Sequence, residues 1–172
     1  MIKRNNMPLT ILGIDPGYAL LGWGVIEYHA SQYRLVGYGA IKTDKSEGMP
    51  ERLKQIYDGV AGIIKQYAPD VCAIEELFFN SNQKTAIGVG EARGAAVVVC
   101  ANAGLPIYEY TPLQIKQALT GYGRAEKQQI QEMVRLVLGL EKAPSPDDAA
   151  DAVAAAICHA NSSGFIERMS HL

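Results

Sequence analysis

The first third of the chain alternates short apolar stretches with turn residues, a pattern that predicts three β-strands. The stretches cover residues 10–15, 21–28 and 33–43 and are rich in Ile, Leu, Val and Tyr. A Pro-Gly pair follows the first stretch and the segment HASQ follows the second. Because turns this short join antiparallel neighbours, we expect the three strands to lie side by side in antiparallel order.

The pattern then predicts helices that alternate with two further strands. Apolar residues recur at helical spacing over residues 50–68, whereas residues 71–79 form the flat apolar run of a strand covered on both faces. Residues 86–101 are apolar on nearly every side, so we expect a helix whose whole surface is covered. Residues 106–110 predict the fifth strand.

Three helices are expected in the last third of the chain. TPLQ is a capping-box pattern with Pro112 at the first helical position, a second helix is closed by Gly139, and SPDD opens the last one. This order predicts an α/β fold: a mixed five-stranded sheet, three antiparallel strands then two parallel, with helices on both faces. We expect one domain over residues 1–172, with residues 162–172 as a flexible tail.

Composition supports a folded cytoplasmic protein. A chain of 172 residues with 48% hydrophobic and 20% charged residues is large enough to bury a core. The three cysteines are odd in number, lie in apolar runs and form no CxxC pair, so we expect reduced thiols and no zinc site. No apolar run has the length of a membrane span, and no secretory signal is recognisable, so we expect no membrane association.

Acidic residues stand at positions where a charge is costly. Asp15 ends the apolar strand ILGID, Glu75 ends the apolar strand CAIE, and Asp148 and Asp151 lie on one face of the alanine-rich last helix. No Arg or Lys lies nearby in sequence to neutralise them. Hard divalent cations such as Mg²⁺ and Mn²⁺ prefer oxygen ligands and would offset this repulsion.

Each acid also has a structural explanation. Asp15 precedes Pro-Gly and could be a turn residue, and side-chain alternation leaves open whether Glu75 or Glu76 points inward. With Ser145 as N-cap, Asp148 would be the third helical residue, where an acid favours the helix dipole. Asp151 lies a turn deeper, where capping no longer applies.

Several segments, in order along the chain, carry a resemblance to a known family: ILGIDPG followed by GWGVI, RLKQIY, AIEELFF, ARGAA, AEK and DAADA. Through them the chain resembles the RuvC Holliday-junction resolvases, nucleases of the ribonuclease H-like fold. The resemblance implies four metal ligands, Asp15, Glu75, Asp148 and Asp151, that hold two Mg²⁺ ions per subunit, with Mn²⁺ able to substitute. Asp147 is not a ligand position of the family, and we interpret it as a first-turn helix charge.

Two lysines and an aromatic residue extend the expected site. Lys127 stands in the first turn of its helix, where a cation opposes the dipole, so a bound phosphate explains it better than helix stability. The resemblance places Lys127, Lys116 and Phe78 against DNA, with Lys127 also in the catalytic group and Phe78 stacking on unpaired bases. For Phe79 core packing is expected, and His159 is expected to be an ordinary helix residue.

The resemblance implies a homodimeric junction endonuclease. Two subunits would cut a four-way DNA junction at symmetry-related phosphodiesters by two-metal hydrolysis, leaving 5′-phosphate and 3′-hydroxyl ends. RuvA and RuvB, the branch-migration machinery, are the implied partners. Because four of the acids belong to the site, the net charge of −2 does not exclude DNA.

Three other classes of protein share part of this pattern. A RuvC-like nuclease that processes structured RNA, such as ribosomal RNA precursors, would share the fold. The kinases and chaperones with a GIDxG-like phosphate loop need two such domains, which this chain is too short to hold. A junction-binding module without catalysis would lack at least one of the four acids.

Overall fold

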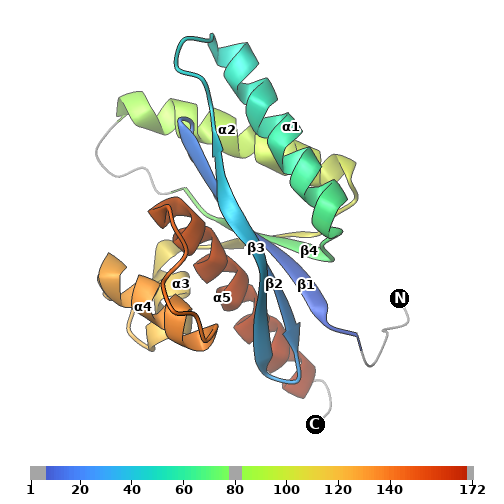
Figure 1. The fold of residues 1–172 in the computed structure, drawn as a ribbon, viewed down its shortest axis with the longest axis vertical. Helices are drawn as coiled ribbons and strands as arrows, with labels where there is room; N and C mark the ends of the chain where they lie inside the picture. Colours follow the sequence, from blue (N-terminus) through green and yellow to red (C-terminus); the bar gives the residue numbers. More distant parts are fainter. Residues whose placement is uncertain (1–6, 78–82, 170–172) are drawn as a thin grey trace.

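The computed structural model describes residues 7–77 and 83–169, and of residues 83–85 and 164–169 it describes the backbone only. The strands are β1 (Leu9–Asp15), β2 (Leu20–His29), β3 (Gln32–Lys42), β4 (Val71–Glu75) and β5 (Ile107–Tyr110). The helices are α1 (Met49–Tyr67), α2 (Gln83–Asn102), α3 (Pro112–Thr120), α4 (Lys127–Val137) and α5 (Asp147–Met169). Figure 1 shows α1 and α2 on one side of the sheet and α3, α4 and α5 on the other.

The sheet has the order β3-β2-β1-β4-β5, with β1 antiparallel to β2 and β2 antiparallel to β3. Strands β4 and β5 extend it in the parallel direction, β4 beside β1 and β5 beside β4. This confirms the predicted mixed five-stranded fold. Strand β4 ends at Glu75, earlier than the expected 71–79, because its parallel pairing with β5 ends where Glu75 lies opposite Tyr110.

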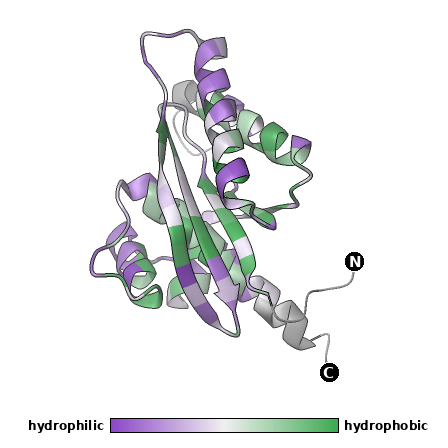
Figure 2. Cartoon of the chain, turned by 45° about the vertical axis from the view of Figure 1, so that its right-hand side comes forward, coloured by the Kyte–Doolittle hydropathy of each residue, from purple (hydrophilic) through white to green (hydrophobic). Residues whose placement is uncertain are grey.

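Each face of the sheet covers its own hydrophobic cluster. Neighbouring residues of β1 point in opposite directions: Ile11 packs against α5, whereas Leu12 packs against α1 and α2. Both side chains are fully buried. In Figure 2 hydrophobic positions run through the middle of the sheet, and hydrophilic positions lie on α1 and towards the β2–β3 hairpin. The helices on both faces are therefore held by apolar burial, the largest favourable term in folding.

Three glycines let α5 approach the sheet at backbone contact. A Cβ atom on Gly13 would lie 1.9 Å from the carbonyl oxygen of Ala152, and one on Gly22 would lie 2.0 Å from that of Asp148. On Gly24 it would lie 2.3 Å from a methyl group of Val153. Gly13 and Gly24 are directly paired across β1 and β2, so they form a flat seat for the helix.

The last helix differs from its expected bounds at both ends. It begins at Asp147, and the carbonyl oxygen of Pro146 accepts hydrogen bonds from the N–H groups of Ala149 and Ala150. Pro146, rather than Ser145, therefore occupies the cap position. The helix continues to Met169, through most of the segment expected to be a tail.

The two remaining composition predictions concern cysteines and membranes. Cys72, Cys100 and Cys158 are all buried and free, as expected for core thiols. Within the part of the chain that the structure describes, no helix is both long and apolar enough to cross a membrane.

Candidate active site

The centre of the site is a pair of carboxylates at the carboxyl ends of two parallel strands. Asp15 is the last residue of β1 and Glu75 the last of β4, and the preceding residues Ile14 and Ile74 lie opposite each other in the ladder. The two side chains are hydrogen-bonded to each other. Because the apolar strands are fixed by the core, their ends bring the two acids together.

The surroundings of Asp15 strongly favour its protonated form. Burial is the largest cause, and together with the charges of Glu75, Asp151 and Asp148 it raises the pKa of Asp15 to about 8. Burial also raises the pKa of Glu75, and the charge of Asp151 adds to this, although Asp15, Lys116 and Lys127 partly oppose it. Two carboxylates this close repel each other, and either a proton or a bound cation relieves that repulsion.

Helix α5 adds two more acids from above the sheet. Its first turn lies directly over Gly22, the residue paired with Asp15, so that Asp148 and Asp151 reach the same strand end. The side chain of Asp151 is 28% exposed, and burial raises its pKa despite the neighbouring Lys127. The glycine contact thus sets the height of both aspartates above the sheet.

Two lysines border these acids. The Nζ atom of Lys127 lies 3.2 Å from Asp151 and 3.4 Å from Asp147. Burial lowers the pKa of Lys127, but its hydrogen bonds to Asp151 and Asp147 outweigh burial and raise it overall. The charge of Lys116 lowers the pKa of Glu75 from the other side. Both lysines therefore stand where they could meet an anionic ligand at the acids.

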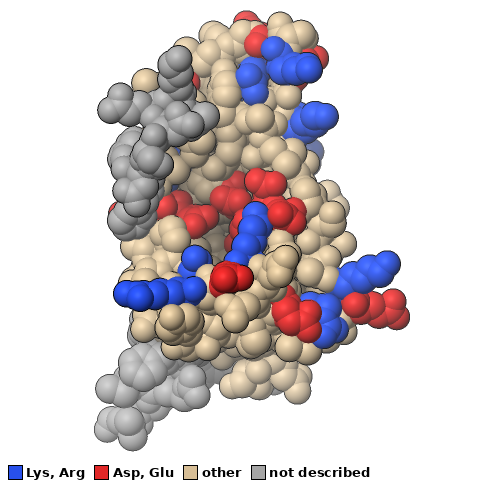
Figure 3. All heavy atoms as spheres, turned by 90° about the vertical axis from the view of Figure 1, so that its left-hand side faces the viewer, with Lys and Arg blue, Asp and Glu red and all other residues tan. Residues whose placement is uncertain are grey.

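A cavity of about 290 Å³ lies between these groups. Its walls come from four elements: β4, α3, α4 and α5. They include Glu75, Lys116, Lys127 and Asp151, together with apolar side chains such as Ile130. Figure 3 shows the corresponding face, on which acidic side chains gather around a hollow with basic side chains beside them.

The donor set fits hard divalent cations. All four acids carry oxygen atoms of the kind that such cations bind, and the charges of Glu75, Asp151 and Asp148 add to burial in raising the pKa of Asp15. Among the described residues, no group of three or more His, Cys, Asp or Glu side chains is arranged as a complete cation cluster. Lys127 instead neutralises Asp151 directly. A bound ion would therefore have to draw the carboxylates inward and displace the ammonium group.

The remaining residues considered in the sequence are Asp147, His159, Phe78 and Phe79. The side chain of Asp147 is 65% exposed, and its carboxylate lies 3.4 Å from the ammonium group of Lys127. His159 is buried, and its Nδ1 atom forms a 2.7 Å hydrogen bond with the hydroxyl of Tyr110. Phe78 and Phe79 lie outside the described residues.

Sequence reasoning missed the residues that seat α5. The signal was present as GWGV in β2, where two glycines alternate on one face of a strand, a spacing that permits another backbone to approach. It also passed over Tyr122, an exposed aromatic residue in the loop between α3 and α4. Nothing in the pattern of one sequence marks such a residue as different from other surface tyrosines.

Comparison with known proteins gives a consistent result. The family model described as crossover junction endodeoxyribonuclease RuvC matches residues 11–159. A RuvC of this description from Alkaliphilus oremlandii is 56% identical over 92% of this chain and 97% of its own length. One from Caldanaerobacter subterraneus is 52% identical over 95% of this chain and 99% of its own.

A solved structure agrees with these relatives. Thermus thermophilus RuvC, determined in complex with Holliday junction substrate, superposes with a TM-score of 0.87 at 40% identity. The match covers 91% of this chain and 96% of that one. The match of sequence and fold over nearly the whole length shows that the chain belongs to the RuvC family of crossover junction endodeoxyribonucleases.

Proposed function

We propose that this protein is an endonuclease that resolves four-way DNA junctions in recombination and repair. It would do so by paired, symmetry-related hydrolysis of two phosphodiesters, leaving 5′-phosphate and 3′-hydroxyl ends. The observation that carries the proposal is the meeting of Asp15, Glu75 and Asp151 with two lysines at one end of the sheet. The junction bound in the Thermus thermophilus structure is the matching substrate class.

Asp15, Glu75, Asp148 and Asp151 would hold two Mg²⁺ ions per subunit, and Mn²⁺ would substitute because it prefers the same oxygen ligands. Ions bound there supply the activation of the attacking water and the stabilisation of the leaving oxygen. The four side chains come from two strands and one helix that share a core, so the backbone positions that carry them are fixed before substrate arrives.

The lysines would hold the phosphate group under attack. Lys127, now paired with Asp151, would exchange this contact for the phosphate once cations neutralise the aspartate. Lys116 approaches Glu75 from α3 and would contact the neighbouring part of the backbone. Phe78 would stack on an unpaired base, as the family resemblance implies.

A homodimer would place two such sites on one junction. Helix α2 carries the exposed apolar side chains Ile87 (68%) and Val98 (52%), which suit contact with a second copy of the helix. Val98→Glu is expected to give monomers in sedimentation experiments and to replace paired cuts by single nicks. RuvA and RuvB would be partners in branch migration, and the cytoplasm would be the compartment.

A synthetic four-way junction tests the proposal against a linear duplex of the same sequence, each with Mg²⁺ or EDTA. We expect paired nicks in the junction only, none in EDTA, and none with Asp151→Asn while junction binding persists. Equal cutting of the linear duplex, or cutting in EDTA, would overturn it. Structured RNA belongs in the same assay, but the relatives are named as DNA enzymes and nothing observed favours RNA.

A further inference from the structure

Tyr122 presents an aromatic ring to solvent beside the candidate active site. It lies in the loop that joins α3 to α4, between Gly121 and Gly123, and it is 58% exposed. Gly121 ends α3 in the left-handed conformation, with φ of 71°, which turns the chain sharply outward. An exposed aromatic ring gains nothing from this position in the isolated protein, because most of its surface remains in water.

The backbone that carries the ring is fixed. The hydroxyl of Thr120 accepts a hydrogen bond from the N–H of Tyr122 at 3.1 Å and donates to the carbonyl oxygen of Lys116 at 2.8 Å. The side chain of Leu113 packs over Gly123 from the start of α3. A ring that is exposed but held by its backbone loses little conformational entropy when a ligand stacks on it.

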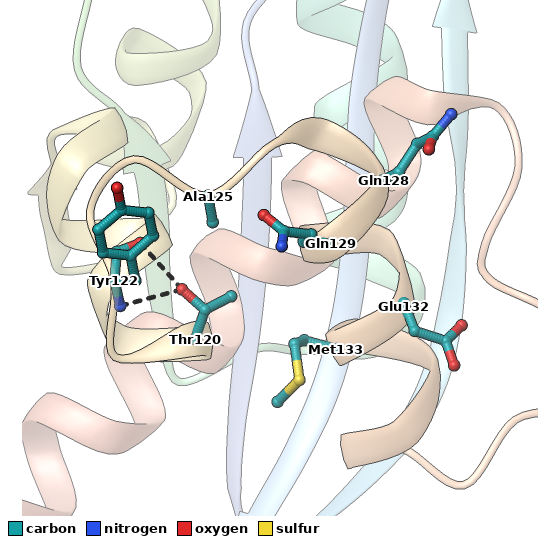
Figure 4. Close-up of a pocket in the computed structure, with 7 residues that line it drawn as sticks. All are labelled: Thr120, Tyr122, Ala125, Gln128, Gln129, Glu132 and Met133. Atoms are coloured by element: carbon teal, nitrogen blue, oxygen red, sulfur yellow. Dashed lines mark hydrogen bonds between the residues drawn. The ribbon is translucent and has the colours of Figure 1, made fainter.

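The ring borders a cavity of about 460 Å³, the larger of the two cavities that flank the start of α4. Figure 4 shows Tyr122 on one side of the cavity, Thr120 and Met133 at its base, and Gln129 extended towards it from α4. The Oε1 atom of Gln129 accepts a 2.8 Å hydrogen bond from the N–H of Glu126, which fixes the amide. Its NH₂ group remains as a donor that faces the cavity.

This cavity adjoins the candidate active site along α4. Lys127 lines the cavity of the carboxylates, and the next residue, Gln128, lines the cavity beside Tyr122. Arg124 is exposed on the loop between them. Among the described residues, neither Arg124 nor Lys116 forms a salt bridge. A phosphate backbone that reaches Lys127 would therefore meet further unpaired cations along this edge.

The acid that lines the cavity does not oppose such a ligand. Glu132 lines the far wall, but Figure 4 shows its carboxylate directed away from Tyr122. Arg135 binds it through two hydrogen bonds, of 2.6 Å and 2.9 Å, and lowers its pKa. The negative charge is thus paired within α4 rather than presented to the cavity.

We propose that this cavity is a subsite for one unstacked nucleobase of the strand whose phosphate lies at Lys127, with the Tyr122 ring stacked on the base. The inference rests on the proposed junction cleavage and adds a base-binding position on the α3–α4 side of the site. The Gln129 NH₂ group would donate to an oxygen or ring nitrogen on the edge of the base. The apolar face of Met133 would lie against its plane.

A nucleobase fits these surroundings better than a protein segment does. The walls offer one aromatic face, one thioether side chain and a single fixed donor, which match a flat ring with acceptors at its edge. The surrounding cations Lys116, Arg124 and Lys127 match a polyanion. Stacking of this kind contributes about 5- to 150-fold in affinity for each base.

The experiment measures junction affinity in Ca²⁺, and cleavage in Mg²⁺, for wild type, Tyr122→Ala and Tyr122→Phe. The junctions carry a single abasic site at each position within four nucleotides of the cut. Tyr38→Ala is the matched control, because it removes another exposed tyrosine, on β3. Thermal unfolding of each variant reports whether the fold is retained.

We expect that at one position the abasic site lowers the junction affinity of wild type about 5- to 150-fold. The affinity of Tyr122→Ala should be the same for that abasic junction as for the intact junction. Tyr122→Phe should behave as wild type, since it keeps the ring, and so should Tyr38→Ala. The subsite is disproved if wild type binds and cuts junctions and Tyr122→Ala has the same affinity and cleavage rate as wild type. It is also disproved if the affinity loss from Tyr122→Ala and the loss from the abasic site add at every position. If wild type neither binds nor cuts junctions, the proposed function fails and the subsite with it.

Discussion

Replacing Gly22 by alanine tests whether the seat of α5 sets the geometry of the carboxylates. An added Cβ atom would lie 2.0 Å from the carbonyl oxygen of Asp148 and 2.2 Å from its carbonyl carbon. Both atoms belong to the backbone of the first turn of α5, so no side-chain rotation relieves the overlap. Real Cβ atoms essentially never approach a neighbour closer than 3.0 Å. The start of the helix must therefore move away from β2 by about 1 Å.

This displacement carries Asp148 and Asp151 away from Asp15, because both aspartates lie on the turn that moves. A misplacement of about 1 Å in a catalytic group lowers the rate by about 100-fold. Strain from a side chain forced into a filled contact costs about 1–3 kcal/mol of stability. We therefore expect Gly22→Ala to lose about 100-fold in cleavage while it remains folded at 25 °C.

Single-turnover cleavage of a four-way junction in Mg²⁺ measures the rate, and urea unfolding measures the stability. Gly62→Ala is the matched control: it lies within α1 and has no atom within 4 Å of the added Cβ. Alanine there should leave cleavage unchanged and stabilise the protein by about 0.5–1 kcal/mol. Cleavage by Gly22→Ala within threefold of wild type, with an unchanged free energy of unfolding, would refute the reasoning.

Three further results are expected. Asp15→Asn in EDTA should raise the free energy of unfolding by at most about 4 kcal/mol at pH 7. The pKa of Asp15 in the folded protein, about 8, lies above the ordinary aspartate value of 3.8, so ionisation of Asp15 weakens the fold increasingly as the pH rises from 3.8 to 8. Urea unfolding across this range should show that the gain in stability vanishes towards pH 4. Lower stability of Asp15→Asn at every pH would contradict this reasoning. Asp147→Asn should cut junctions within about threefold of wild type, whereas Asp151→Asn should not cut; equal losses would show that Asp147 is also a ligand. Tyr110→Phe should lower the free energy of unfolding in urea by about 1–3 kcal/mol, because it removes the hydroxyl that forms the 2.7 Å hydrogen bond with buried His159. An unchanged urea midpoint would exclude a contribution of this hydrogen bond to stability.

Much of the fold could be predicted because local patterns are strong. The Thr111 capping box and the αL residue Gly121 bound α3 closely, and the alternation of β1 assigns its two faces correctly. The bounds that failed depend on distant partners. Strand β4 stops at Glu75 because β5 offers no partner beyond Tyr110, and α5 begins one residue past Pro146 because of backbone bonds that residue type does not reveal.

In the candidate site, too, the residues could be recognised from local sequence, whereas the contacts between them could not. Asp15, Glu75 and Asp151 are recognisable in the sequence because each acid interrupts an apolar element, where an unpaired charge is costly. Their family order in the chain supports the same choice. The ion pair between Lys127 and Asp151 joins residues that are separated by α4 and the loop after it, and only the folded chain brings them to 3.2 Å.

The sequence by itself determined which residues carry charge into the core and which elements hold them. Only the tertiary structure decided how closely these elements approach. Contact between α5 and Gly22 depends on the twist and packing of the whole sheet, and so does the position of Tyr122 at the edge of a cavity. Residue types and spacing set local conformation, whereas distances between distant segments follow from the packing of all side chains at once.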